Sequence, residues 1–145
     1  MCLLLLYIGI LIYFVLFSDQ LGRADGYNTY RYNLVPFQEI HRFIAYRNSV
    51  PLWAFLLNLI GNVFVFVPIG FLFPMIGKRE VGLVRAMASA LGLSLCIELL
   101  QLVTRVGVFD VDDLILNTLG GAIGWMAFCL TRKLFYQLVD RKEDK

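Results

Sequence analysis

Polar side chains that could bind a ligand or transfer a proton recur at helical spacing inside an otherwise strongly apolar part of the chain. The first set is Ser94, Glu98, Gln101 and Arg105. Members of this set are three or four residues apart, so on a helix they share one face. An ionisable side chain in a membrane helix costs at least ~2.5 kcal/mol. We therefore expect these groups to contact one another, water or a ligand.

A second polar set with the same spacing follows shortly afterwards. It consists of Asp110, Asp113 and Asn117, and the same face continues through Gly120, Gly121 and Gly124. Small residues permit close contact between membrane helices. Because neither stripe can be left in lipid without cost, we expect the two stripes to face each other. Two further polar residues on another apolar segment are expected to complete this polar cluster: Asn58 and Asn62.

The acidic segment at 110–113 has two possible roles. Asp110, Asp112 and Asp113 could hold a divalent cation, since such ions prefer oxygen ligands. However, Asp112 and Asp113 are consecutive and point about 100° apart on a helix, which disfavours a shared ion. Asp110 is also suited to cap a helix N-terminus, where acidic residues in the first turn are favoured. Capping is the preferred interpretation, and the sequence indicates no metal and no cofactor.

The composition predicts a membrane protein. The chain is 59% hydrophobic and 17% charged, with a mean hydropathy of +0.72, which is unlike a soluble domain. The formal net charge is only +2 and the basic residues are scattered, so nucleic acid is not an expected partner. Cys2, Cys96 and Cys129 lack the spacing of a zinc site, and we interpret them as small buried hydrophobic residues.

Four apolar segments organise the chain as a single domain over 1–145. The predicted spans are 1–17, 52–73, 83–103 and 114–130, followed by a charged tail at 131–145. The first segment lacks a basic n-region and a small-residue cleavage site, so we interpret it as a retained span rather than a signal peptide. The predicted fold is therefore all-α, a polytopic bundle of four transmembrane helices.

The polar connection between the first two spans contains one amphipathic segment. Apolar residues recur at helical spacing there, namely Phe37, Ile40, Phe43 and Ile44. This pattern predicts a short interfacial helix in the first extracellular loop, and Pro36 is expected to lie in its first turn.

The distribution of Lys and Arg predicts the orientation. Four spans put both termini on one side, and eight of the 13 basic residues lie on that side. The positive-inside rule then predicts cytoplasmic N and C termini. The polar stripes would open outward, within a multi-pass protein of the bacterial cell membrane.

At these residues the sequence resembles the VanZ-like family of bacterial membrane proteins. The resemblance rests on N-L-V-P-F at 33–37, on N-x-x-x-N with a following F-x-P-x-G at 58–70, and on S-x-x-x-E-x-x-Q-x-x-x-R with F-D-V-D-D-L-I-L-N-T-L-G-G-A-I-G at 94–124. It implies association with reduced susceptibility to teicoplanin. It carries over no catalytic residues, so the polar residues transfer as motif positions only.

Three functions are compatible with the polar cluster and this resemblance. The first is a binding protein that modulates envelope susceptibility to lipoglycopeptides, with an outward polar pocket for an amphiphile or a lipid-linked cell-wall intermediate among the membrane lipids. Teicoplanin carries an acyl chain and vancomycin does not, which fits action within the lipid.

The second function is a membrane enzyme acting on a lipid-linked substrate, with Glu98 as acid or base. Against it, the chain has no Ser-His-Asp set or zinc motif, and its one histidine, His41, has no matched nucleophile. The third is a structural polar network without a ligand. The sequence leaves the oligomeric state open.

Overall fold

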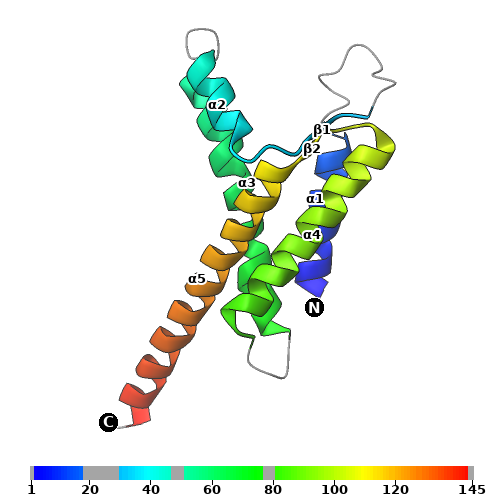
Figure 1. The fold of residues 1–145 in the computed structure, drawn as a ribbon. Helices are drawn as coiled ribbons and strands as arrows, with labels where there is room; N and C mark the ends of the chain where they lie inside the picture. Colours follow the sequence, from blue (N-terminus) through cyan, green and yellow to red (C-terminus); the bar gives the residue numbers. More distant parts are fainter. Residues whose placement is uncertain (1, 18–29, 47–50, 77–80, 144–145) are drawn as a thin grey trace.

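The structure is a computed structural model that describes residues 2–17, 30–46, 51–76 and 81–143. Most of these residues are helical (Figure 1). The elements are α1 (Cys2–Phe17), β1 (Tyr32–Asn33), α2 (Gln38–Ala45), α3 (Leu52–Leu72), the 3-10 turn η2 (Phe73–Met75), α4 (Leu83–Thr104), β2 (Phe109–Asp110) and α5 (Val111–Glu143). The three longest helices are α3, α4 and α5, and α1 packs beside α4.

Three helices are long and apolar enough to cross a membrane. These candidate spans are Phe55–Met75, Leu83–Thr104 and Val111–Asp140, whereas α1 is apolar along its length but has only 16 residues. At 1.5 Å per residue the 16 residues of α1 rise about 24 Å, less than the ~30 Å of a bilayer's hydrocarbon core. Three of the predicted four spans are thus supported, and the first span stays a prediction.

The last helix is longer than the predicted span. α5 continues without a break through the segment predicted as a charged tail and ends at Glu143. Residues 131–143 contain no Gly or Pro and are rich in good helix formers, so the rise in charge at 131 does not end the helix. At its other end α5 begins at Val111, three residues before the predicted start.

Glycine permits close contact between α3 and α5. A Cβ added at Gly124 would lie 2.0 Å from the carbonyl oxygen of Val67, and one at Gly70 would lie 1.9 Å from that of Gly121. No side chain fits in such a space, because real Cβ contacts are longer than 3.0 Å. The prediction that the glycines of α5 permit close helix contact is confirmed, and the helix that they contact at Val67 and Gly70 is α3.

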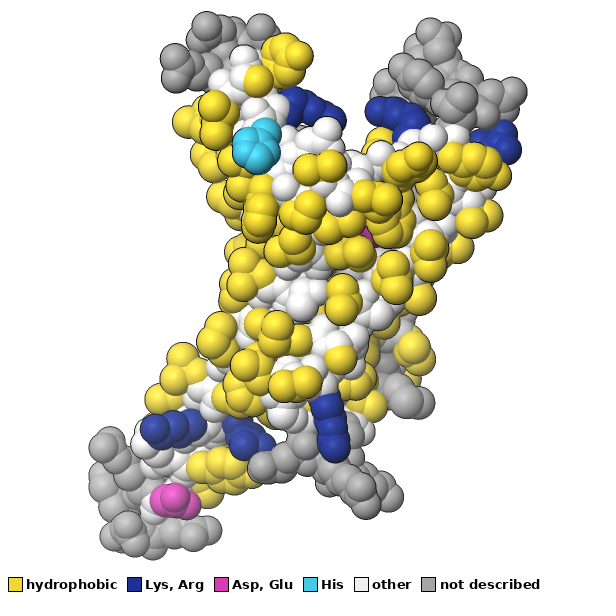
Figure 2. Space-filling model, in the orientation of Figure 1, with side chains coloured by type: hydrophobic (Ala, Val, Ile, Leu, Met, Phe, Trp, Pro, Cys, Tyr) yellow, Lys and Arg dark blue, Asp and Glu magenta, His cyan; other side chains and the backbone are white. Residues whose placement is uncertain are grey.

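The apolar side chains divide between a small core and a wide exterior. The buried core cluster consists of Leu4, Leu11, Phe66, Ile69, Ala90 and Ile97, from α1, α3 and α4. Figure 2 shows hydrophobic side chains over the middle of the visible face, with Lys and Arg near its ends. Cys2 and Cys96 belong to this exterior and are exposed, so the prediction that they are buried was wrong. The reason is that both cysteines lie on helix faces that point away from the other helices.

Two short strands connect distant parts of the chain. β1 and β2 pair in parallel, with Tyr32 opposite Phe109 and Asn33 opposite Asp110. The sequence does not predict this pairing, because two residues are too few to show the alternation of polar and apolar side chains that marks a strand. It places the segment before α2 directly beside the start of α5 (Figure 1).

The predicted short helix is present as α2, with a different start. It begins at Gln38 and its N-cap is Phe37, which has a φ of 64°. Pro36 therefore precedes the cap rather than lying in the first turn. The Phe43 ring stacks on Phe55 of α3, with centroids 4.2 Å apart, and this contact docks α2 on the beginning of α3.

Candidate functional site

The polar stripes of α4 and α5 face each other, as expected. The Asn117 side chain donates to Ser94 Oγ at 2.8 Å, and Ser94 is fully buried. One turn further along α4, Glu98 is only 2% exposed and accepts the backbone N–H of Asp110 through Oε2 at 2.9 Å. Two contacts between the stripes therefore hold α4 against the start of α5.

Asp110 is the link between three segments. Its Oδ1 accepts the backbone N–H of Asp112 at 2.8 Å, which confirms the predicted N-cap of α5. The same oxygen accepts the side-chain amide of Asn33 from β1 at 3.1 Å. Together with the bond to Glu98, these contacts join the loop before α2, the α5 N-terminus and α4.

Residues 33–37, here called the latch, are bound to the first turn of α5. Within the latch, Asn33 Oδ1 accepts the backbone N–H of Val35 at 3.1 Å. At its end, the backbone N–H of Phe37 donates to Asp112 Oδ1 at 2.5 Å. The left-handed backbone of Phe37 is unfavourable for a bulky residue, so this bond to a buried carboxylate helps to hold it. The N-L-V-P-F motif at 33–37 carries part of the family resemblance, but its place beside α5 is not predictable from the sequence.

The two asparagines of α3 have different environments. Asn62 donates its side-chain amide to Asp113 Oδ1 and so connects α3 to α5. Asn58 lies one turn earlier and is exposed, so the structure does not bring it into the buried cluster. Asn58 lies before the stretch from Val63 to Phe71, in which α3 closely contacts the glycines of α5.

The end of the α4 stripe lies against the turn that follows it. Gln101 is half-buried, and a Cβ at Gly107 would lie 2.7 Å from the Gln101 Cβ. Arg105 is exposed, with its guanidinium 4.6 Å from the centroid of the Tyr30 ring and Nη2 at 3.3 Å from the Tyr30 hydroxyl. Arg105, at the end of the stripe, therefore contacts the segment that precedes the latch.

The three aspartates considered for a cation are engaged with different neighbours. Asp110, Asp112 and Asp113 contact β1, the latch and α3, respectively. Among the residues that the structure describes, no three His, Cys, Asp or Glu side chains are grouped to hold a metal ion. Likewise, no buried side-chain nitrogen or oxygen in these ranges lacks a hydrogen-bond partner. The cluster is thus internally satisfied.

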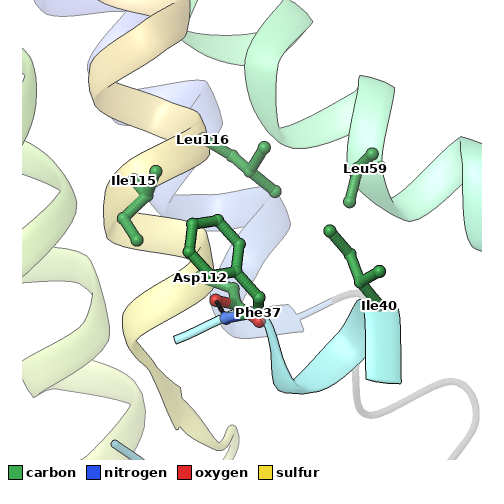
Figure 3. Close-up of a pocket in the computed structure, with 6 residues that line it drawn as sticks. All are labelled: Phe37, Ile40, Leu59, Asp112, Ile115 and Leu116. Carbon is green, nitrogen blue, oxygen red and sulfur yellow. Dashed lines mark hydrogen bonds between the residues drawn. The ribbon is translucent and has the colours of Figure 1, made fainter. Parts of the chain in front are cut away.

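A small apolar pocket lies beside the polar cluster (Figure 3). Its volume is about 70 Å³, and it is lined by Phe37, Ile40, Leu59, Asp112, Ile115 and Leu116. The lining comes from the latch, α2, α3 and α5, so sequence periodicity within one helix could not have revealed it. Asp112 belongs both to the pocket and to the bond that holds the latch.

Comparison with known proteins gives two matches. The family model described as VanZ/LLP1 matches residues 4–132. Protein VanZ of Enterococcus faecium is 32% identical over 133 residues, an alignment that covers 90% of this chain and 74% of that protein. No solved structure is significantly similar to the chain.

Proposed function

Because the chain belongs to the VanZ/LLP1 family, we propose that it modulates the susceptibility of the bacterial envelope to lipoglycopeptide antibiotics of the teicoplanin type. It does so by binding an amphiphile or a lipid-linked cell-wall intermediate at the polar cluster. Family membership and the apolar helices identify a bacterial membrane protein, and action within the membrane fits an antibiotic that carries an acyl chain.

The observation that carries this proposal is the juxtaposition of polar and apolar surfaces at one end of the helices. Asp112 lines an apolar pocket, and its neighbour Asp110 belongs to the hydrogen-bonded cluster with Glu98 and Asn33. An amphiphile needs both surfaces at once, with its polar part near the cluster and its hydrocarbon part between helices. The exposed Arg105 beside Tyr30 supplies a cation for an anionic group.

The orientation is part of the proposal. With α1 as a first span, both termini lie on one side, and the excess of Lys and Arg on that side favours the cytoplasm. The latch and the polar cluster then face outward, where wall precursors and antibiotics are found. The α2 helix carries its apolar residues on one face, and we infer that it lies on the outer membrane surface.

A structural network without a ligand is the second candidate. It is favoured by one observation, that every buried polar side-chain atom in the described ranges has a partner. A satisfied network stabilises a fold by itself. The two readings differ in what they predict for a variant that folds normally.

The experiment is expression in a susceptible Gram-positive host, with teicoplanin and vancomycin susceptibility measured in parallel. Glu98→Gln keeps an oxygen acceptor for the Asp110 N–H and removes the charge. Arg105→Ala removes the exposed cation. Both should abolish protection against teicoplanin and leave vancomycin susceptibility unchanged, while the amount of protein in the membrane stays normal.

The matched control is Thr104→Val on the same helix. Thr104 is exposed and its hydroxyl donates to Leu100 O of its own helix at 2.6 Å, so protection should be retained. Loss of protection in proportion to protein abundance would support the structural reading. A wild-type chain that gives no protection would remove the resistance role. Incubation with lipid-linked wall precursor, followed by mass spectrometry, separates binding from catalysis, since only an enzyme with Glu98 as acid or base yields a new species.

A further inference from the structure

The pocket beside the latch is suited to hydrocarbon rather than to water. The surface that its six lining residues present is entirely apolar. Its one charged lining residue, Asp112, directs Oδ1 to the backbone N–H of Phe37. A buried water needs two to four polar partners, and this surface offers none. An apolar group is therefore the occupant that the chemistry favours.

The size of the pocket limits that occupant further. Its volume of about 70 Å³ is well below the ~300–1,000 Å³ of pockets that enclose a drug-sized ligand. A whole antibiotic or a lipid head group is too large. A short stretch of a single hydrocarbon chain fits, because the rest of the lipid can remain outside.

The pocket opens onto a surface that lipid must cover. Ile115 of α5, in the pocket wall, is 41% exposed. Leu119 on α5 is 48% exposed, and Ile60 on α3 is 55% exposed. These residues lie on two of the candidate membrane spans. Exposing such a surface to water is unfavourable, so bilayer hydrocarbon covers it and reaches the mouth of the pocket. The acyl chain that enters the pocket therefore comes from a lipid of the bilayer.

We propose that the pocket seats a short stretch of an acyl chain of a bilayer phospholipid, close to its head group, with Ile40 and Leu59 on one side, Ile115 and Leu116 on the other and Phe37 between them (Figure 3). Asp112 acts as a positioning residue, since it holds the backbone of Phe37 in the conformation that forms the wall. This inference deepens the proposed function by naming the site for the hydrocarbon part of the amphiphile. It rests on the proposed function for its link to antibiotic susceptibility, whereas the binding of an acyl chain can be tested separately.

The test uses the full chain reconstituted in vesicles of phosphatidylglycerol and phosphatidylethanolamine. A small fraction of the phosphatidylglycerol carries a photoactivatable diazirine on one acyl chain, close to the glycerol ester, and cross-linked residues are located by mass spectrometry. Labelling of Phe37 and Leu59 should exceed that of Leu119, which is exposed to lipid outside the pocket.

Two variants fill the pocket, each with a matched control. Ile40→Trp on α2 should lower labelling of Phe37 and Leu59 to the level of Leu119, whereas Ile44→Trp, one turn further on the same helix and outside the pocket, should leave it unchanged. Leu116→Trp and Met126→Trp form the corresponding pair on α5, since Met126 is exposed and lies outside the pocket. If Leu116→Trp fails to fold, the α2 pair decides the result, because Ile40 and Ile44 are both partly exposed.

Labelling of Phe37 and Leu59 that does not exceed labelling of Leu119, or that survives both filling variants in folded protein, would overturn the proposal. Labelling that also falls in both controls would do the same, because it would show a general change in lipid contact. No antibiotic is present in this assay. A labelled pocket in a chain that gives no teicoplanin protection would therefore refute the proposed function and leave the acyl-chain site standing.

Discussion

Asp110→Ala should destabilise the fold much more than Asp110→Asn. Asp110 Oδ1 accepts two hydrogen bonds, from Asp112 N at 2.8 Å and from Asn33 Nδ2 at 3.1 Å. Loss of an N-cap costs about 1 kcal/mol. The amide of Asn33, which is 8% exposed, would lose its partner at a cost of about 1–3 kcal/mol. The sum for Asp110→Ala is about 2–4 kcal/mol.

Asp110→Asn retains an Oδ1 in the same position, and Asn caps helices about as well as Asp. Its expected cost is below about 1 kcal/mol. The free energy of unfolding can be measured by titrating purified protein from mild detergent micelles with a denaturing detergent, with loss of helicity as the readout. Asn33→Ala and the double variant complete a double-mutant cycle, in which we expect a coupling of about 1 kcal/mol between the two side chains.

Two results would refute this expectation: equal stability of Asp110→Ala and Asp110→Asn, or a cycle without coupling. Equal stability would mean that the cap and the bond to Asn33 contribute nothing measurable. Zero coupling with an unstable Asp110→Ala would confine the effect to the cap, and β1 would then not be held to α5 by this side chain.

Two further predictions use the same unfolding measurement. Gly124→Leu should cost at least about 1–3 kcal/mol, because its Cβ would lie 2.0 Å from the Val67 carbonyl oxygen. Gly92→Leu on α4, where nothing lies within 4 Å of an added Cβ, should be neutral or stabilising, and a similar loss in both would contradict the close-contact argument. Ser94→Ala should cost about 1–3 kcal/mol by leaving the buried Asn117 amide unpaired, and adding Asn117→Leu should recover part of that loss; a further loss instead would show that the bond is not the cause.

Local periodicity was enough to predict several features of this protein. The apolar runs predicted the bounds of α3 and α4 to within one residue, because a membrane helix must be apolar along its whole length. The spacing of Ser94, Glu98 and Asn117 predicted that these side chains lie between α4 and α5. Such predictions succeed because the residues that share a helix face depend only on the turn per residue.

Charge and length in the sequence were less informative about helix ends. The increase in charge at 131 predicted a tail, yet α5 continues to Glu143. The last apolar run predicted a span that starts at 114, yet α5 begins at Val111, directly after the Asp110 cap. Composition reports the surroundings of a segment, whereas helix ends depend on capping and on breakers such as Gly and Pro.

Only the tertiary structure decided how the latch completes the site. Asn33 and Asp110 are 77 residues apart, and Phe37 and Asp112 are 75 residues apart. The structure also left Asn58 outside the cluster and formed the pocket from four segments. A contact between distant segments depends on where whole helices begin and how closely they pack, and here glycine contacts set the α3–α5 spacing while the Asp110 cap sets the start of α5. Neither distance is encoded in the periodicity of a single helix, which is why the chain had to fold before these partners could be identified.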